Sequence, residues 1–595
     1  MSSSEDDQSS EDEFSDGEED VLQAIFDVED EEEEGEFEGF PIQLPENMNW
    51  TRTEFEANIE DYSLQCGPTG NAPRQESALG YFQLFLENRL IEQVTEFTNK
   101  NAVAKRAVDW KRTTTAEIKA LLAMTIISND LLVVPRDERY FLSGGNTSLF
   151  HTPGMRNIFS SRKRYFDLKK YISFVDPDHE KTEDEARDVL YKIRNVSRTI
   201  NQKFFDLYNC HESVSVDEGM VPFKGRLKIK VRMPDKPVKY GIKLFMLCDS
   251  SNGYCKKFDV YVGSDERNAG NLGKTGKTVL NLLQGLENSH HRVYMDNFYT
   301  SPILFLAMKN IGLYGCGTVR NRKGFPMNEL KAVQTRQRGD IAWLSWNSSM
   351  LALKWKDRKE IFALSSIHSS PVPRPAPRVR DIEDSGDEEG DDATVTRRVK
   401  ERGQWRQLTI SCPHLIRDYN KFMGGVDLHD QMTSVNKSKK QMRWYMRMFV
   451  KLLQMCVFNA YVIESHYKAH QGHGHRKRDL LSFKQELCIQ LIGDFPSTHE
   501  NSHKRRRSSN EYPERMDGVG EHMVCRGDGN DHRCAVCLKK QQEFMRMNRG
   551  VSKKDCPFKD RKSTFKCMKC NVYLCIGKEG SNCFVDYHSR LQYWL

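Results

Sequence analysis

The first 40 residues of this 595-residue chain contain no lysine or arginine, although they hold nineteen aspartates and glutamates. The chain also lacks, near its start, the basic stretch and apolar run that open a secretory signal. Its longest apolar-rich stretch, 449–463, is interrupted by Lys451, Gln454 and Asn459, which predicts a buried helix and argues against a membrane span. We therefore expect a soluble protein of several domains, since the usual domain size gives about four.

The acidic N-terminal region, residues 1–74, is predicted to be disordered. Its first 40 residues have few apolar side chains beyond VLQAIF at 21–26, too few to bury the surface that folding requires. That short run is alternatively a partner-binding helix, and the serines among the acids resemble acidophilic kinase sites. The whole chain carries a net charge of +5, so the residues after position 40 carry +24. This excess indicates a polyanionic partner or evenly spread surface lysine.

A helical pattern follows the acidic region. Apolar residues recur at a spacing of three to four, at Tyr81, Phe82, Phe85, Leu86, Leu90, Ile91, Val94 and Phe97. A second helix is predicted after the N-capping threonines 113–115, and others over 156–175 and 183–208. Towards the other end of the chain, 443–467 and 480–491 are predicted as two further helices.

Short apolar strands replace the helical pattern between residues 212 and 319. They are HESVSVDE, KYGIKLFMLCD, KKFDVYVG and HRVYMDN, and GNLGKTGKTVLNLLQGLE supplies a loop and crossover helix between the last two. This order favours a mixed α/β sheet. More β pattern lies over 342–366, a Pro-rich and then acidic segment at 368–400 predicts a disordered loop, and 408–412 returns as a strand.

Three aspartates are the first candidates for chemistry: Asp217 in VSVDEGMVPFKGR, Asp296 in VYMDNFYTS and Asp427 in KFMGGVDLHDQM. The first two end short β-branched or apolar runs, where a sheet can hold a carboxylate rigidly. Taken singly, each is equally a strand end or a turn cap. Together they can hold two hard divalent cations, which would activate the attacking oxygen of a phosphodiester and stabilise the leaving one.

The words around these aspartates carry a family resemblance. VDEGMVPFKGR, KPVKYGIKLFMLCDS, GYCKKFDVYVG, YMDNFYTSPILF, GCGTVRNRKGFP and YNKFMGGVDLHDQM occur in family order, and residues 75–595 resemble a piggyBac-type transposase. The resemblance implies a multidomain α/β protein with an RNase H-like catalytic core, a β-rich insertion, a discontinuous helical dimerisation and DNA-binding domain, and a C-terminal cross-brace zinc domain. The implied segments are helical 75–211 and 437–500, core 212–325 and 408–436, insertion 326–407, basic linker 501–530 and zinc domain 531–595.

The resemblance also assigns the catalytic residues. It places the ligands of two Mg²⁺ ions at Asp217, Asp296 and Asp427, and Asp430 matches a further acidic position of the family. Asp430 is a ligand, a support for one, or an aspartate on a helix surface. Glu218 is left out because, on a strand, it would face away from its neighbour Asp217.

DNA-binding residues are predicted near the strand ends. Phosphate contact and solvated surface charge are equal readings for the basic residues Lys224, Arg226, Lys228, Lys230, Lys236, Lys239, Lys243, Arg320, Arg322 and Lys323. Lys224, Arg226, Lys239 and Arg320 are the ones we select. Trp444 matches a family aromatic near the catalytic centre and either stacks on an unpaired base or belongs to a core.

Eight of the sixteen cysteines lie between Cys525 and Cys583. Without a secretory signal, such clustering indicates metal ligation in a reducing compartment and argues against a disulfide framework. The Cys-x2-Cys pairs suit Zn²⁺, and their alternation indicates two zinc ions in a RING- or PHD-like cross-brace. The predicted ligands are Cys534, Cys537, Cys575 and Cys583 for one zinc, and Cys567, Cys570 and His588 for the other. His532 is the first candidate for the missing ligand, before Cys556 and Cys525.

The zinc domain is expected to be structural and to touch DNA at a transposon end through its basic residues, or alternatively to bind a chromatin peptide. KRRR at 504–507, helped by 476–478, indicates nuclear import or a DNA-binding surface.

The whole pattern resembles a DDE/D cut-and-paste transposase that acts as a homodimer on double-stranded DNA ends and inserts at TTAA. The alternatives are a domesticated nuclear DNA-binding protein without transposition activity, and a nuclease of RNase H type.

Overall fold

The computed structural model describes most of the chain after residue 47. The described residues are 48–133, 137–141, 158–159, 161–234, 236, 238–263, 272–371, 378–380, 394–401, 404–435, 443–469, 478–493, 495, 522–527, 529–548, 551–568, 570–576, 582–589 and 593–594. They form two compact units, the first ending before residue 500 and the second made from the C-terminal residues. The predicted acidic tail, its VLQAIF run, the KRRR signal and most of the 368–400 loop lie outside the described residues.

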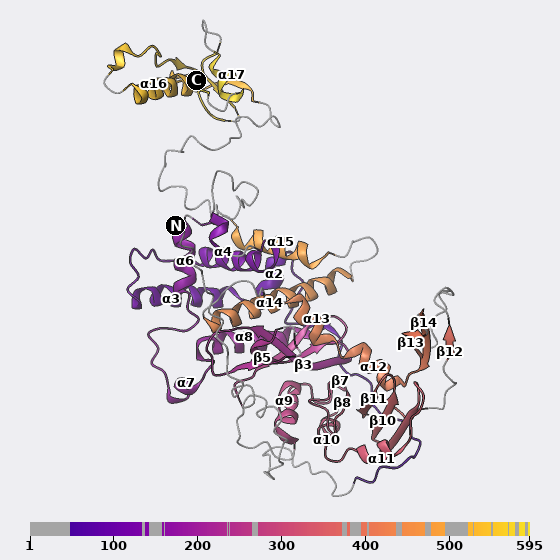
Figure 1. Ribbon diagram of the computed structural model, residues 1–595. Helices are drawn as coiled ribbons and strands as arrows, with labels where there is room; N and C mark the ends of the chain where they lie inside the picture. The colour runs from indigo at the N-terminus through magenta and orange to yellow at the C-terminus, as the bar shows by residue number, and fades with distance from the viewer. Residues whose placement is uncertain are drawn as a thin grey trace, which may run out of the picture. The chain divides into compact units, whose positions relative to one another are not determined.

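Helices from both ends of the first unit pack together (Figure 1). They are α2 (Ala78–Gln83), α3 (Asn88–Ala104), α4 (Thr115–Ile126), α6 (Arg162–Tyr171), α7 (Glu183–Arg187), α8 (Tyr191–Leu207), α14 (Trp444–Ala469) and α15 (Leu480–Ile492). Side-chain oxygens of Ser77, Thr114, Ser161 and Asp479 cap the first turns of α2, α4, α6 and α15. The α14 and α15 helices contact α2 and α4, so this helical domain is discontinuous in sequence.

The helix α14 is long and apolar enough to cross a membrane by length and composition, but 89% of its most apolar window is buried in the structure. Its residues are shared between the helical domain and the sheet below, since it contacts α2, α8 and β3. This is the buried helix predicted from the interrupted apolar run.

A nine-stranded mixed sheet forms the other half of the first unit. Its strands are β3 (Ser213–Pro222), β4 (Lys230–Arg232), β5 (Tyr240–Asp249), β6 (Cys255–Val260), β7 (Arg292–Met295), β8 (Tyr314–Thr318), β9 (Ile341–Trp346), β10 (Met350–Lys356) and β11 (Glu360–Ser365). The order is β4-β5-β3-β7-β8-β11-β10-β9, with β6 also on β5. Only β3, β7 and β8 run parallel to one another. The helices α9 (Gly273–Leu283) and α10 (Pro302–Asn310) supply the crossovers into β7 and β8.

The predicted β-rich insertion belongs partly to this sheet. Strands β9 to β11 extend it, because β11 pairs with β8. A separate three-stranded sheet contains β12 (Arg378–Arg380), β13 (Thr394–Glu401) and β14 (Gln404–Ser411). The short helix α11 (Met327–Ala332) precedes β9, and α12 (His414–Phe422) and α13 (Gly425–Met432) follow β14.

Residues 48–74 correct the predicted boundary of the disordered region. Thr51 bonds β9 through Ser345 in both directions, at 2.9 and 2.7 Å, and the Glu60 N–H donates to the Tyr314 hydroxyl at 2.9 Å. The segment ends in β1 (Gly67–Pro68), which pairs with β2 (Tyr208–Asn209). Hydrogen bonds to residues hundreds of positions away hold this segment, which we call the strap, in place. Its own sequence has no periodicity from which these contacts could be predicted.

The second unit contains short elements only. They are β15 (Val524–Arg526), β16 (His532–Arg533), α16 (Ala535–Met547), η7 (Lys553–Asp555), β17 (Lys562–Ser563), β18 (Phe565–Cys567) and α17 (Cys583–Ser589). Its core is small and includes four cysteines. A core of this size needs further stabilisation, for example by a structural metal, and the cysteine clusters described below can bind one.

Candidate active site and zinc centres

Two of the three predicted aspartates come from adjacent parallel strands, Asp217 from within β3 and Asp296 from the residue directly after β7. Val216 of β3 lies opposite Met295 of β7, and Asp217 and Asp296 are the residues that follow this pair in the sequence. Adjacent strands lie about 4.8 Å apart. Asp296 directly follows β7, and its Oδ1 accepts the Phe298 N–H at 2.9 Å. The sheet therefore presents two carboxylates side by side at one edge of its parallel part.

The third aspartate comes from α13, which packs on β3. The Val426 N–H donates to the Ser215 hydroxyl at 3.2 Å. A Cβ on Gly425 would lie 2.6 Å from that hydroxyl oxygen and 2.8 Å from the Asp249 carbonyl oxygen. Only glycine allows this approach. It brings the first turn of α13, with Asp427, over the strand that carries Asp217.

Lys236 provides positive charge to this carboxylate group. Its Nζ lies 3.5 Å from Asp217 Oδ2 and 3.4 Å from the Glu218 carbonyl oxygen. Burial opposes its charge, but the carboxylates of Asp217, Glu218 and Asp427 raise the pKa of Lys236. Lys236 was predicted either to contact DNA phosphate or to be a solvated surface charge, whereas it lies beside Asp217, a predicted metal ligand.

The pKa values of two of the aspartates, Asp217 and Asp296, lie above the usual range. Burial and the neighbouring Glu218 carboxyl raise the pKa of Asp217, and burial raises the pKa of Asp296. Desolvation and like charge are the two effects that a bound divalent cation would offset. The site therefore has the electrostatics of a cation site.

Glu218, which sequence analysis left out, is part of this environment. Its Oε1 accepts from Lys243 Nζ at 2.9 Å in a buried ion pair. Its charge also acts on Asp217 and Asp296. It shapes the charge balance of the site while its own carboxylate is engaged by Lys243.

Asp430 lies one turn beyond Asp427, and both of its oxygens are bonded. Oδ1 accepts from Lys451 Nζ at 2.6 Å, and Oδ2 accepts the Met220 N–H at 3.3 Å. Burial opposes its charge, but Lys451 holds the pKa of Asp430 below its usual range. The assignment of Asp430 as a metal ligand stays a prediction.

The three aspartates offer only carboxylate oxygens as ligands. Among the described residues, sets of three or more donors within 4.8 Å of one another occur only at two Cys/His clusters. The aspartates form no such set there, and a pair of ions about 3.5–4 Å apart spreads its ligands more widely. The donor chemistry, all carboxylate, fits Mg²⁺.

The four basic residues predicted to bind DNA are exposed, and the predicted aromatic is not. Lys224, Arg226, Lys239 and Arg320 are exposed. Arg320 Nε donates to Asn297 Oδ1 at 2.8 Å, and its charge acts on Asp296. Trp444 is half-buried against the main core with its ring edge-on to Tyr445, and base stacking by Trp444 stays a prediction.

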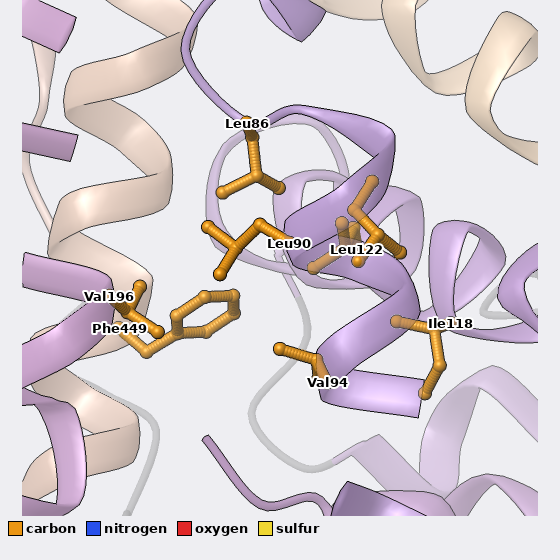
Figure 2. A pocket seen from close by; sticks show the side chains of 8 residues that line it. Leu86, Leu90, Val94, Ile118, Leu122, Val196 and Phe449 are labelled. Atoms are coloured by element: carbon orange, nitrogen blue, oxygen red, sulfur yellow. The ribbon is translucent and has the colours of Figure 1, made fainter. Parts of the chain in front are cut away.

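A small pocket in the helical domain has no part in this chemistry (Figure 2). Its lining is entirely apolar: Leu86, Leu90, Ile91, Val94, Ile118, Leu122, Val196 and Phe449. A reaction site needs convergent polar groups, which this lining does not offer.

The first cysteine cluster is the predicted one. Cys534, Cys537, Cys575 and Cys583 are buried, with their donor atoms within 4.8 Å of one another. Cys537 Sγ lies 3.9 Å from Cys575 Sγ and 3.6 Å from Cys583 Sγ. Four thiolates on a tetrahedral zinc are about 3.8 Å apart, so this set fits Zn²⁺. All sixteen cysteines are free thiols, which agrees with metal ligation and not with a disulfide framework.

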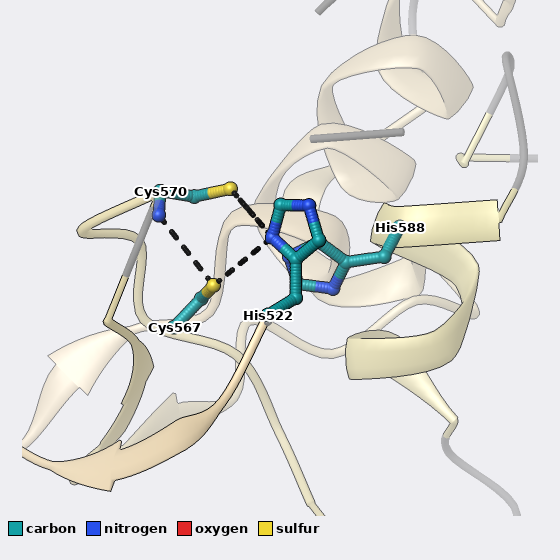
Figure 3. Close-up of side chains that lie close together, drawn as sticks. All are labelled: His522, Cys567, Cys570 and His588. Carbon is teal, nitrogen blue, oxygen red and sulfur yellow. Dashed lines mark hydrogen bonds between the residues drawn. The ribbon is translucent and has the colours of Figure 1, made fainter. Parts of the chain in front are cut away.

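The second cluster holds Cys567, Cys570 and His588 as predicted, but its fourth member is His522 (Figure 3). His522 Nδ1 lies 3.5 Å from both sulfurs, and Cys570 Sγ lies 3.6 Å from His588 Nε2. Sulfur and nitrogen ligands of a tetrahedral zinc are about 3.6 Å apart. His588 Nδ1 donates to the Phe584 carbonyl at 2.7 Å, which leaves Nε2 for the metal.

The prediction of His532 as this ligand is wrong. The His532 ring stacks on Tyr573 at 4.0 Å instead. In the pairing of β15 with β18, Val524 lies opposite Cys567. His522, two residues before Val524, is thereby placed beside the cluster. Cys525 and Cys556 are likewise outside both clusters. The two sets alternate along the chain, as a cross-brace requires.

A sequence profile of the family described as Transposase IS4 matches residues 77–461, which is well over half of the chain. The chain belongs to this family, the IS4/piggyBac-type transposases. The matched range includes all the aspartates of the candidate active site and most of the helical domain. The zinc unit lies beyond it.

Two human relatives of the transposase family are similar over most of this chain. PiggyBac transposable element-derived protein 3 is 23% identical over 521 residues, covering 85% of this chain and 75% of the relative. The chimeric ERCC6-PGBD3 protein is 23% identical over 521 residues, covering 85% of this chain and 42% of that protein.

A solved structure shares the fold. The piggyBac transposase in a synaptic complex with hairpin DNA superposes with a TM-score of 0.60 over 86% of this chain and 98% of that chain, at 22% identity. The mixed α/β architecture, with its large sheet, is therefore that of a piggyBac transposase.

Proposed function

We propose that this transposase cuts and joins DNA with two Mg²⁺ ions held by Asp217, Asp296 and Asp427. The observation that carries the proposal is that Asp217 and Asp296 directly follow the paired residues Val216 and Met295 of two parallel strands, with α13 packed over the first strand. Phosphoryl transfer needs charge neutralisation and in-line positioning rather than a covalent residue. When bound, two ions supply both.

The strand order supports an RNase H-like core. Strands β6, β5 and β3 are successive antiparallel neighbours, and β7 and β8 then continue in parallel from β3. The segment from β9 to β14 interrupts this core before α13 returns to it. Such a core places carboxylates at strand ends and on one following helix.

The same proposal covers the partners. Exposed Lys224, Arg226, Lys239 and Arg320 would contact DNA phosphates, and the zinc unit, stabilised by two Zn²⁺ ions, would hold a transposon end. We also propose a homodimer acting on two ends, insertion at TTAA, and a nuclear location.

An excision assay tests the proposal. A reporter interrupted by the chain's own flanking genomic DNA is expected to be restored by the wild-type protein. Asp217→Asn, Asp296→Asn and Asp427→Asn should each abolish excision while DNA binding persists. Asp61→Asn, at an exposed position of the strap, is the matched control. Excision by an aspartate variant at the wild-type level would refute the proposed site.

A domesticated DNA-binding role is the second candidate, because PiggyBac transposable element-derived protein 3 is by its name an element-derived protein. It predicts DNA binding without excision even for the wild-type chain. Mobility-shift assays run beside the excision assay separate the two candidates.

A further inference from the structure

Lys451 carries a charge in the middle of the long, largely buried helix α14. Its side chain is 2% exposed, and its neighbours Leu452 and Leu453 in α14 are fully buried. A buried ammonium is costly unless hydrogen bonds and an opposite charge compensate it. Its partners must therefore account for its presence.

Both partners of Lys451 lie at the C-terminal half of α13 and beyond. Its Nζ donates to Asp430 Oδ1 at 2.6 Å and to Thr433 Oγ1 at 2.7 Å. The Thr433 hydroxyl in turn donates to the His429 carbonyl at 2.7 Å. One ammonium thus joins α14 to the last turn of α13.

Asp430 passes this connection on to the sheet. Its second oxygen accepts the Met220 N–H of β3, three residues after Asp217. Gly219 leaves the necessary room, since a Cβ there would lie 3.1 Å from Asp430 Oδ1 and 2.5 Å from Met246 Sδ. The chain of bonds therefore runs from α14 through α13 to the strand of the first aspartate.

A buried histidine ties the same helix to the next hairpin. His429 is fully buried, and its Nδ1 lies 2.8 Å from the Gly253 carbonyl oxygen, in the turn between β5 and β6. Its ring packs edge-on against Phe458 of α14. Thus α13 is fixed from two sides, at positions two and three residues after Asp427.

We propose that Lys451 is a positioning residue of the active site, which locks Asp430 as a strut between α13 and β3 so that Asp427 faces Asp217. Asp430 is then a support and not a metal ligand. The inference rests on the proposed function, since it concerns the same carboxylates. It assigns a task to a lysine that the sequence shows only as a break in an apolar run.

Two readings of Asp430 predict opposite results for Lys451. If Asp430 is the strut, loss of Lys451 leaves a half-buried carboxylate without its cation and disturbs α13. If Asp430 binds metal, loss of Lys451 frees its oxygen and leaves metal binding equal or tighter. The double variant Asp430→Asn/Lys451→Met separates them further, because asparagine can still accept the Met220 N–H while no unpaired charge is left.

The test measures Mn²⁺ bound to full-length, zinc-loaded protein by electron paramagnetic resonance, at a temperature where circular dichroism shows each variant folded. Lys451→Met and Asp430→Asn should each weaken Mn²⁺ binding about 10- to 100-fold, as losses of groups that support metal ligands do. The double variant should return to within about threefold of wild type. Lys468→Met, in the same helix at 41% side-chain exposure, is the control and should change nothing.

Two outcomes overturn the proposal. Wild-type Mn²⁺ affinity in folded Lys451→Met, with only a lower melting temperature, would make Lys451 a stabilising residue alone. A double variant as weak as Asp430→Asn would make Asp430 a ligand. The binding measurement needs no cleavage, so a wild-type chain without excision activity would refute the proposed function and leave this pattern intact.

Discussion

At the scale of single residues, Gly425 sets the distance between the catalytic helix and the sheet. The atoms facing it are the Ser215 hydroxyl and the backbone carbonyl of Asp249, and a carbonyl in a strand cannot rotate away. Its neighbour Gly424 faces no atom within 4 Å. Two adjacent glycines of one motif therefore have different tasks, one in packing and one in the turn.

Gly425→Ala is expected to destabilise the protein by about 1–3 kcal/mol, because overpacking forces α13 off β3. Excision should fall further than the folded fraction does, since Asp427 moves with the helix. Urea denaturation and the excision assay measure the two effects. Gly424→Ala should match wild type in both, and equal behaviour of the two alanine variants would contradict this account.

Residue identity alone revealed part of the site. The motif words predicted Asp217, Asp296 and Asp427, and the Cys-x2-Cys pairs predicted four of the eight residues in the two Cys/His clusters. His522 and Lys451 were beyond such reasoning, because strand pairing delivers one and helix packing buries the other. His522 lies far from Cys567 in the sequence, and this separation does not indicate that the two residues share a zinc site.

At the scale of elements, a buried ion pair joins α4 to α6. Arg164 donates to Glu117 through Nε at 2.8 Å and Nη2 at 2.5 Å, and the Thr113 hydroxyl also donates to Glu117. The guanidinium additionally covers the Trp110 ring, 4.7 Å from its centroid. The neighbouring pair Lys163–Asp109 is exposed and 3.6 Å long.

Arg164→Met should cost about 3–5 kcal/mol of unfolding free energy, since it leaves the Glu117 carboxylate buried without its cation. Adding Glu117→Gln to that variant should recover much of the loss. Lys163→Met, which removes a surface pair, should change stability by no more than about 0.5 kcal/mol. Urea denaturation of the four proteins checks this, and a large effect of Lys163→Met would count against the explanation.

Elements were predictable where their own sequence is periodic. The helix expected over 443–467 is observed as α14, and that over 480–491 as α15. The strap at 48–74 was not predictable, because distant partners such as Ser345 and Tyr314 order it. The pairing of β11 with β8 could not be predicted either, because the neighbours of a strand are decided only when the whole sheet assembles.

At the scale of the whole molecule, the chain divides into a large unit with two hydrophobic cores and a small unit with a cysteine-rich one. The large unit has extensive hydrophobic cores, and we expect it to fold without zinc. The small unit has a small core beside two Cys/His clusters, so we expect zinc binding to contribute to its folding free energy.

Chelation of zinc should therefore unfold the small unit and leave the large one unchanged. Calorimetry of the full chain is expected to lose one transition and retain the other. Zinc analysis should find two ions per wild-type chain, about one in His522→Ala and two in His532→Ala. Loss of zinc from His532→Ala, but not from His522→Ala, would contradict the ligand set.

The short helix α17 carries one ligand of each zinc set, Cys583 and His588. The first set is complete only when Cys583 is present, and the second only when His588 is present. Removal of α17 is therefore expected to leave both sets one ligand short at the same time.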